Sequence, residues 1–302
     1  MSADVTQMGP KKKPGFPIDL DAVLTGRDIT LRYRDWGGEG VPIVLLHGLS
    51  SSLRIWDFVA PILAGRFHVV AVDQRGHGLS TKPDHGYGFA EVTGDLASFI
   101  ELVGLGRPVI VGHSWGGNVA VQFGADYPQA TRGLVLVDGG FIERSKDATW
   151  EQAEREMRPP EIDGAPVDRF VQMMRQWPSL KDHWRPELED MILYNFDMRD
   201  GKIYRRLSIP NHMKIARAIF EQRPSELLPI IPAPVLIVPA FRHAASEEEQ
   251  RWQEYRELGL EAIKKARSDV EVHPMPDTIH DVPIQRPREL AALIADFAEK
   301  LS

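Results

Sequence analysis

Residues 109–124, "VIVGHSWGGNVAVQFG", carry the clearest structural signal in the sequence. The first of them are aliphatic and predict a buried strand, and a helix-forming segment follows from Gly116. Between them stands Gly112-His113-Ser114-Trp115-Gly116, a G-x-S-x-G pattern in the strand–turn–helix context that this pattern requires. Such a turn strains the backbone of the serine, lifts its hydroxyl above the sheet edge and aims a helix N-terminus at developing negative charge. The sequence therefore predicts that Ser114 is a nucleophile.

Further aliphatic runs recur on both sides of this stretch. They do not alternate with polar residues, which is typical of strands buried on both faces of a parallel sheet. The runs lie at 41–48, 67–73, 108–114, 133–140, 234–240 and 269–275, and an alternating segment at 29–36 predicts one more strand. Helical patterns fall between the runs. This alternation predicts an α/β fold with a mostly parallel central sheet flanked by helices.

One interval breaks the alternation. Residues 141–229 carry helical segments but no convincing strand, so we expect a helical cap inserted after the sixth strand. The core of the fold then consists of residues 19–140 and 230–302. Residues 1–18 are rich in Lys, Pro and Gly, and we expect them to form a flexible N-terminal lead-in.

The composition narrows the classes of partner and cofactor. The 302 residues carry a formal net charge of −7, which argues against nucleic acid or an anionic membrane as an obligate partner. No stretch is apolar for long enough to cross a bilayer, and the N-terminus lacks a signal-peptide core, so we expect a cytoplasmic protein. The chain has no cysteine, and its histidines lack the spacing of metal ligands, so no metal or other cofactor is expected. The sequence does not indicate an oligomeric state.

Four motifs, in this order along the chain, resemble those of the α/β-hydrolase superfamily. They are "LLHGLSSS" (45–52), "VVAVDQRGHGLS" (69–80), "GHSWGG" (112–117) and "DTIHDVP" (277–283). The resemblance implies an α/β-hydrolase fold and acyl transfer through Ser114. It also implies an oxyanion hole formed by the backbone N–H groups of Leu49 and Trp115, because acyl transfer needs two donors aimed at the tetrahedral oxygen.

His280 is the predicted general base. It lies between the last predicted strand and the C-terminal helix, in a loop that returns to the same sheet edge as Ser114. The superfamily also carries its catalytic histidine at this place. His113 is next to the nucleophile, but we expect the strained turn to point its side chain away from Ser114.

The carboxylate of the triad is harder to assign. The superfamily most often places it after the strand that follows the cap, and there "PVLIVPAFRH" (234–243) puts His243 at the position of the acid. A minority of the superfamily places the acid at the end of the strand before the cap, where "LVLVDGG" (134–140) carries Asp138. We favour Asp138, although it is one carbon shorter than the glutamate of those relatives. Glu247, Glu248 and Glu249 remain alternatives.

The residue type of the predicted nucleophile limits the classes of reaction that the protein could catalyse. Dehalogenases and epoxide hydrolases of this fold need an aspartate where this chain has Ser114, whereas a serine forms an acyl-enzyme that water resolves. We therefore expect a carboxylesterase or lactonase that hydrolyses a small-molecule ester or lactone. The rival hydrolases are a carbon–carbon bond hydrolase and a proline aminopeptidase, and the rival from another class is a ligand-binding receptor without turnover.

The cap is rich in aromatic and methionine residues, and a few of them should line the pocket above the serine. Together with two histidines, they are the candidates for substrate binding. These candidates are His47, Trp150, Met174, Trp177, Trp184 and His212.

Overall fold

The computed structural model describes residues 16–146, 148–241 and 246–302, without the side chain of residue 248. Most of the lead-in predicted at residues 1–18 lies outside these ranges. Ile18, at the end of that predicted segment, already begins strand β1.

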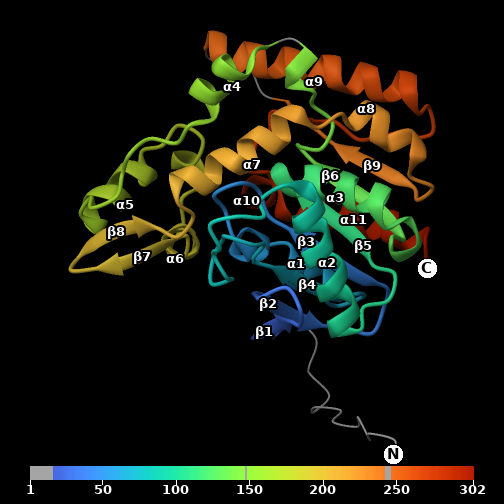
Figure 1. Ribbon diagram of the computed structural model, residues 1–302, viewed down its shortest axis with the longest axis horizontal. Helices are drawn as coiled ribbons and strands as arrows, with labels where there is room; N and C mark the ends of the chain where they lie inside the picture. Colours follow the sequence, from blue (N-terminus) through green and yellow to red (C-terminus); the bar gives the residue numbers. More distant parts are fainter. Residues whose placement is uncertain (1–15, 147, 242–245) are drawn as a thin grey trace, which may run out of the picture.

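An eight-stranded sheet forms the centre of the protein (Figure 1). From one edge to the other, its strands are β1 (Ile18–Leu24), β2 (Ile29–Gly37), β4 (His68–Val72), β3 (Pro42–Leu46), β5 (Val109–His113), β6 (Gly133–Val137), β9 (Val235–Val238) and β11 (Glu271–Val272). The pairs β1–β2 and β2–β4 are antiparallel, and every pair from β4 to β11 is parallel. Two short strands, β10 (Ala240–Phe241) and β12 (Met275–Pro276), pair with each other. The predicted, mostly parallel sheet is confirmed.

Helices cover both faces of the sheet, which explains the uninterrupted aliphatic runs. Successive residues of a strand point to opposite faces, so Val135 and Leu136 of β6 belong to two different apolar clusters. The cluster with Leu136 packs on α2 (Phe89–Val103), α3 (Trp115–Asp126) and α9 (Glu247–Ala266). The cluster with Val135 packs on α1 (Ala60–Leu63), α10 (Val282–Gln285) and α11 (Pro287–Glu299). Each strand is thus apolar on both sides.

The segment between β6 and β9 contains five helices among the described residues: α4 (Trp150–Met157), α5 (Val167–Arg175), α6 (Pro186–Leu193), α7 (Ile209–Glu221) and α8 (Pro224–Leu227). We expected only helices there, but an antiparallel hairpin of β7 (Phe196–Arg199) and β8 (Lys202–Arg205) lies between α6 and α7. Asp200 and Gly201 form its loop with φ of 51° and 69°, as hairpin turns with two left-handed residues require. The hairpin buries Phe196 and Ile203 against Phe170 of α5. Figure 1 shows α5, α6 and the hairpin on one side of the central sheet.

The parallel strands bring polar residues to one edge of the sheet. His47, Ser114 and Asp138 directly follow β3, β5 and β6, which are neighbours in the sheet. His280 reaches the same edge in the loop between β12 and α10. The carboxyl ends of parallel strands are where α/β folds build their sites, so this edge is the place to look for the chemistry.

Candidate active site

Ser114 occupies the sharp turn between β5 and α3 that the sequence predicts. Its backbone has φ 53° and ψ −122°, a conformation that is strained for a residue with a side chain. Two backbone hydrogen bonds hold the turn: Ser114 N donates to Val137 O of the neighbouring strand at 2.9 Å, and Gly117 N donates to Ser114 O at 2.9 Å. Hydrogen bonds to the neighbouring strand and to the start of the helix therefore stabilise the strained conformation of Ser114.

The segment that follows β6 passes directly behind this turn. A Cβ atom at Gly139 would lie 2.0 Å from the carbonyl oxygen of Ser114, so only glycine fits there. The "DGG" sequence thus serves two purposes, because its aspartate supplies a carboxylate while its first glycine lets the backbone approach the nucleophile.

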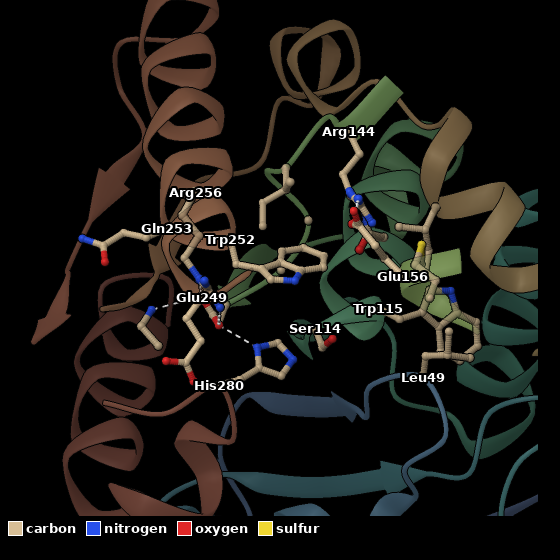
Figure 2. Close-up of a pocket in the computed structure, with 18 of the residues that line it drawn as sticks. Leu49, Ser114, Trp115, Arg144, Glu156, Glu249, Trp252, Gln253, Arg256 and His280 are labelled. Carbon is tan, nitrogen blue, oxygen red and sulfur yellow. Dashed lines mark hydrogen bonds and ion pairs between the residues drawn. The ribbon is translucent and has the colours of Figure 1, made fainter. Parts of the chain in front are cut away.

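Asp138 and His280 form a direct hydrogen bond. His280 Nδ1 lies 2.6 Å from Asp138 Oδ2. Since Asp138 can only accept when ionised, Nδ1 carries the proton and Nε2 keeps its lone pair. The side chain of His280 is 46% exposed while that of Asp138 is fully buried, so the imidazole faces the cavity and the carboxylate stands behind it. Figure 2 shows Ser114 and His280 at the same cavity.

Asp138 has further donors that the sequence analysis missed. Arg256 of α9 donates from Nε to Oδ1 at 2.8 Å and from Nη2 to Oδ2 at 2.7 Å. The backbone N–H of Ala240 donates to Oδ1 at 3.1 Å. Burial alone would raise the pKa of Asp138, but the hydrogen bonds from Arg256 and His280 outweigh it and hold that pKa well below its ordinary value. Asp138 is therefore a carboxylate throughout the range in which enzymes work.

The Asp138 carboxylate changes the pKa of His280. Burial lowers the pKa of His280, but its hydrogen bond to Asp138 and the negative charge there raise it more, so the pKa lies above the ordinary histidine value. His113 also supports the loop, because its Nε2 donates to the carbonyl oxygen of His280 at 2.9 Å. Burial lowers the pKa of His113 to about 4, so it makes this contact as a neutral ring.

The "HG" loop after β3 packs against the nucleophile. A Cβ atom at Gly48 would lie 3.4 Å from Ser114 Oγ, and the next residue, Leu49, lines the same cavity as Trp115. Figure 2 shows Leu49 and Trp115 side by side at one end of the site. The arrangement places the peptide that carries the Leu49 N–H close to the hydroxyl that it is predicted to serve.

Neutral histidines fix this loop. His47 Nδ1 donates to Gly48 O at 2.7 Å, and Gln74 N donates to His47 Nε2 at 3.0 Å. Ser50 N donates to His77 Nε2 at 3.2 Å, and the His77 ring stacks on Trp115 with centroids 5.1 Å apart. Burial lowers the pKa of His47 to about 4, and that of His77 falls well below its ordinary value for the same reason. Neither ring therefore takes up a proton at neutral pH.

A cavity of about 470 Å³ lies over Ser114. Both the core and the segment inserted between β6 and β9 line it. The core contributes α3 and α9, and the inserted segment contributes the β6–α4 connection, α4 and α7. The wall residues from these elements are Asn118, Ile142, Arg144, Glu156, Met157, His212, Ile219, Glu249, Trp252, Gln253 and Arg256. The space suits a small molecule.

Only one of the six predicted substrate-binding residues lies at this cavity among the described residues. His212 lines it, with Nε2 donating to Met157 O at 2.9 Å and Nδ1 within 2.8 Å of the Ser50 hydroxyl. The other five lie elsewhere. His47 is buried in its own loop, Trp150 packs on Phe220, Met174 packs in apolar clusters, Trp177 is 48% exposed, and Trp184 lies under the Arg175 guanidinium.

The structure instead assigns the polar wall to residues that the sequence analysis did not single out. Arg144 is buried, forms an ion pair with Glu156 and lies against the rings of Trp252 and Tyr255, at 4.8 Å and 5.3 Å from their centroids. Figure 2 shows Arg144 and Glu156 close together at the cavity, on the other side of Trp252 from Arg256. A positive and a negative charge thus meet at the cavity wall as a pair.

The alternative acids lie on α9, whose first residue is Glu247. Glu247 is exposed, and Glu249 lines the cavity. The side chain of Glu248 and the whole of His243 lie outside the described residues. The carboxylate that the described contacts place against the His280 ring is that of Asp138, whose Oδ2 lies 2.6 Å from His280 Nδ1.

Other classes of site find no support in the part of the chain that the structure describes. There, no group of three or more histidine, aspartate or glutamate side chains is arranged to hold a metal ion. Within the same ranges, no helix is long and apolar enough to span a bilayer.

Part of the chain is similar in sequence to known hydrolases. The chain is similar to 2-(acetamidomethylene)succinate hydrolase of Mesorhizobium japonicum, with 38% identity over 110 residues that cover 36% of this chain and 39% of that protein. It is also similar to Epoxide hydrolase 1 of Caenorhabditis elegans, with 37% identity over 133 residues that cover 42% of this chain and 33% of that protein. The chain thus spans less than two fifths of the length of these curated relatives.

A solved structure extends the likeness to the whole fold. E-2-(acetamidomethylene)succinate hydrolase superposes with a TM-score of 0.74 and 24% identity, over 94% of this chain and 100% of that chain. The sequence profile of the Alpha/beta hydrolase family matches residues 43–293, most of the chain. The expected α/β-hydrolase fold is confirmed, and the protein belongs to the alpha/beta hydrolase family.

Proposed function

We propose that this protein is a serine hydrolase that cleaves a small-molecule carboxylic ester or lactone. The observation that carries the proposal is the 2.6 Å hydrogen bond between Asp138 and His280, at the same cavity as a serine held in a strained turn. An imidazole oriented by a carboxylate, at the same cavity as a strained serine, supports a hydrolase over a binding protein without turnover.

The reaction follows from these positions. Ser114 Oγ attacks the carbonyl carbon of the substrate, and His280 Nε2 takes the hydroxyl proton. The negative charge that develops on the carbonyl oxygen is held by the N–H groups of Leu49 and Trp115. The tetrahedral intermediate collapses, the alkoxide leaves with the proton from His280, and an acyl-enzyme remains. A water molecule then repeats the sequence, with His280 again as the base, and releases the acid.

The nucleophile separates this chain from part of its family. Alkyl-ester chemistry on an epoxide or a halide needs an aspartate at position 114, and this chain has a serine. The aminopeptidase alternative needs a free carboxylate for the substrate amine. Glu156 and Glu249 line the cavity, but the charge of Glu156 is paired with Arg144, and Glu249 is not free of partners either. These points favour a neutral ester or lactone group at Ser114.

The test is a panel of p-nitrophenyl esters of increasing chain length and of simple lactones, with Ser114→Ala as the null variant. Ser98→Ala, which removes a half-buried helix serine whose hydroxyl donates to Gly94 O, controls for handling and folding. We expect the wild type and Ser98→Ala to turn over at least one compound, and Ser114→Ala to lose about 10³-fold or more in kcat.

A fluorophosphonate probe supplies a second reading that does not depend on the substrate. We expect it to label wild type at Ser114 and to leave Ser114→Ala unlabelled, as mass spectrometry would show. Labelling without ester turnover would move the proposal to another acyl or carbon–carbon substrate. Absence of both would favour the receptor alternative.

A further inference from the structure

The arginine beside the triad carboxylate is unusual, because it competes with the imidazolium for the same negative charge. Arg256 and His280 both bond Asp138 Oδ2, at 2.7 Å and 2.6 Å. The carboxylate that is proposed to stabilise the protonated imidazole is therefore already part of an ion pair. The side chains of Asp138 and Arg256 are 0% and 15% exposed, so water screens this pair weakly.

Stability alone is a poor reason for such a pair. Burying two charges costs hydration free energy that their attraction only repays in part, and apolar replacements are often as stable. Arg256 comes from the middle of the long helix α9, and its Nε and Nη2 grip both carboxylate oxygens in the fork geometry that only arginine offers. Such a contact fixes the plane of the carboxylate as well as its charge.

We infer that Arg256 is a positioning residue of the proposed triad: it fixes the Asp138 carboxylate toward His280 and offsets part of its charge, so that His280 remains an unprotonated base at lower pH. The inference rests on the proposed function. The geometry brings the positive charge close to the imidazole, since Arg256 Nη2 and His280 Nδ1 both donate to Asp138 Oδ2 and therefore lie about 5 Å apart or less.

Other charged and titratable groups surround the imidazole. They are Asp138 at the end of β6, His113 at the end of β5, Asp281 in the same loop, and Arg256 and Glu249 of α9 at the cavity wall. The negative groups Asp138 and Asp281 favour the charged imidazole, and Arg256 opposes them, in agreement with its lowering effect on the pKa of His280. Removing the guanidinium should therefore let that pKa rise.

Two substitutions separate charge from geometry. Arg256→Gln removes the positive charge, and Arg256→Lys keeps a charge but loses the two-pronged contact. Arg251→Gln, an exposed arginine of the same helix, is the matched control. The readout is the acid limb of the pH profile for fluorophosphonate labelling of Ser114, together with kcat and KM on one ester and the thermal unfolding midpoint.

We expect Arg256→Gln to move the acid limb upward by roughly 0.5–2 pH units, the range that Coulomb's law gives for one charge at this separation in media between water and protein surface. We expect Arg256→Lys to keep the limb within about 0.3 units of wild type while kcat falls by about tenfold. The control should match wild type in both.

A limb that stays in place in Arg256→Gln, or loss of folding in both variants, would overturn the inference and leave Arg256 a purely structural residue. Failure of the proposed function looks different, because wild type itself would then resist labelling and show no turnover. The wild-type measurement therefore comes first and tells the two failures apart.

Discussion

The substitution Asp138→Asn tests the site most directly, and its effect can be worked from the contacts. The carboxylate takes two bonds on Oδ1, from Arg256 Nε and Ala240 N, and two on Oδ2, from Arg256 Nη2 and His280 Nδ1. An asparagine can place its NH₂ group on either side. On the side of Arg256 Nε and Ala240 N, the NH₂ group would face two N–H donors, and neither of them can accept a hydrogen bond. Toward His280, it would face one such donor, Arg256 Nη2.

The second orientation is therefore favoured, and it has a chemical consequence. The NH₂ group would donate to His280 Nδ1, which moves the imidazole proton to Nε2. Nε2 is the atom that must accept the proton of Ser114, so the base is lost through the wrong tautomer. We expect a loss of about 10³–10⁴ in kcat, equivalent to about 4–5.5 kcal/mol.

The same change leaves the buried guanidinium of Arg256 without its counter-charge. Breaking a buried pair in this way costs about 3–5 kcal/mol of unfolding free energy. In a chain of 302 residues, with an unfolding entropy of about 2.1 cal/mol/K per residue, that corresponds to a fall in the unfolding midpoint of roughly 5–8 °C. The assay is kcat and KM on p-nitrophenyl acetate at a temperature below both transitions, with circular dichroism to confirm the folded state.

Asp281→Asn is the matched control, since Asp281 is next to His280 in sequence but, among the described residues, its side chain forms no hydrogen bond with the imidazole. We expect it to lose less than about threefold in kcat. The reasoning is refuted if folded Asp138→Asn keeps more than a tenth of the wild-type kcat, because Asp138 would then be a structural partner of Arg256 only.

Three further predictions concern the nucleophile, the base and the wall of the cavity. Gly139→Ala should lower kcat by about 10²-fold or more, because its new Cβ would displace the Ser114 backbone, whereas Gly104→Ala, which meets open space, should cost about 1 kcal/mol in stability and leave kcat unchanged. The acid limb of kcat/KM should reflect the pKa of His280, which lies above the ordinary histidine value, so activity should fall as the pH drops through that pKa; a limb well below pH 6 would contradict this. Trp252→Ala should raise KM for aromatic esters by about tenfold while kcat changes little, and equal KM values would remove Trp252 from the binding wall.

The positions of the candidate catalytic residues were predictable from the sequence because they depend on strand ends. The order of a parallel sheet brings the residues after β5 and β6 together, whatever the helices do, and Ser114 and Asp138 stand at those points. The sequence left the reach of the shorter aspartate in doubt. In the structure the two side chains are in direct contact, because the loop of His280 comes close enough to Asp138. His113 stabilises this loop through its 2.9 Å hydrogen bond to the His280 carbonyl oxygen.

The walls of the site were less predictable, since they depend on which face of a helix turns inward. Arg256 is one of many charged residues in α9, and nothing in its local sequence indicates that it points at a carboxylate 118 positions away. A few aromatic residues of the inserted segment were expected at the substrate, but the three tryptophans named, Trp150, Trp177 and Trp184, pack against neighbours within that segment or face solvent. The hairpin was missed although its Asp200-Gly201 pair is a turn signal, because helical patterns surround it.

The positions of the four donors to Asp138 along the chain also have a consequence during synthesis on the ribosome. The donors come from residues that lie 102, 118 and 142 positions further along the chain. At ordinary rates of translation, a ribosome needs about 7–30 s to make the segment from Asp138 to His280. During that interval the strained serine turn can form, because its own strand and helix are already complete, but no imidazole is available to activate it. The proposed triad is therefore expected to be complete only after the residues around His280 have left the ribosome.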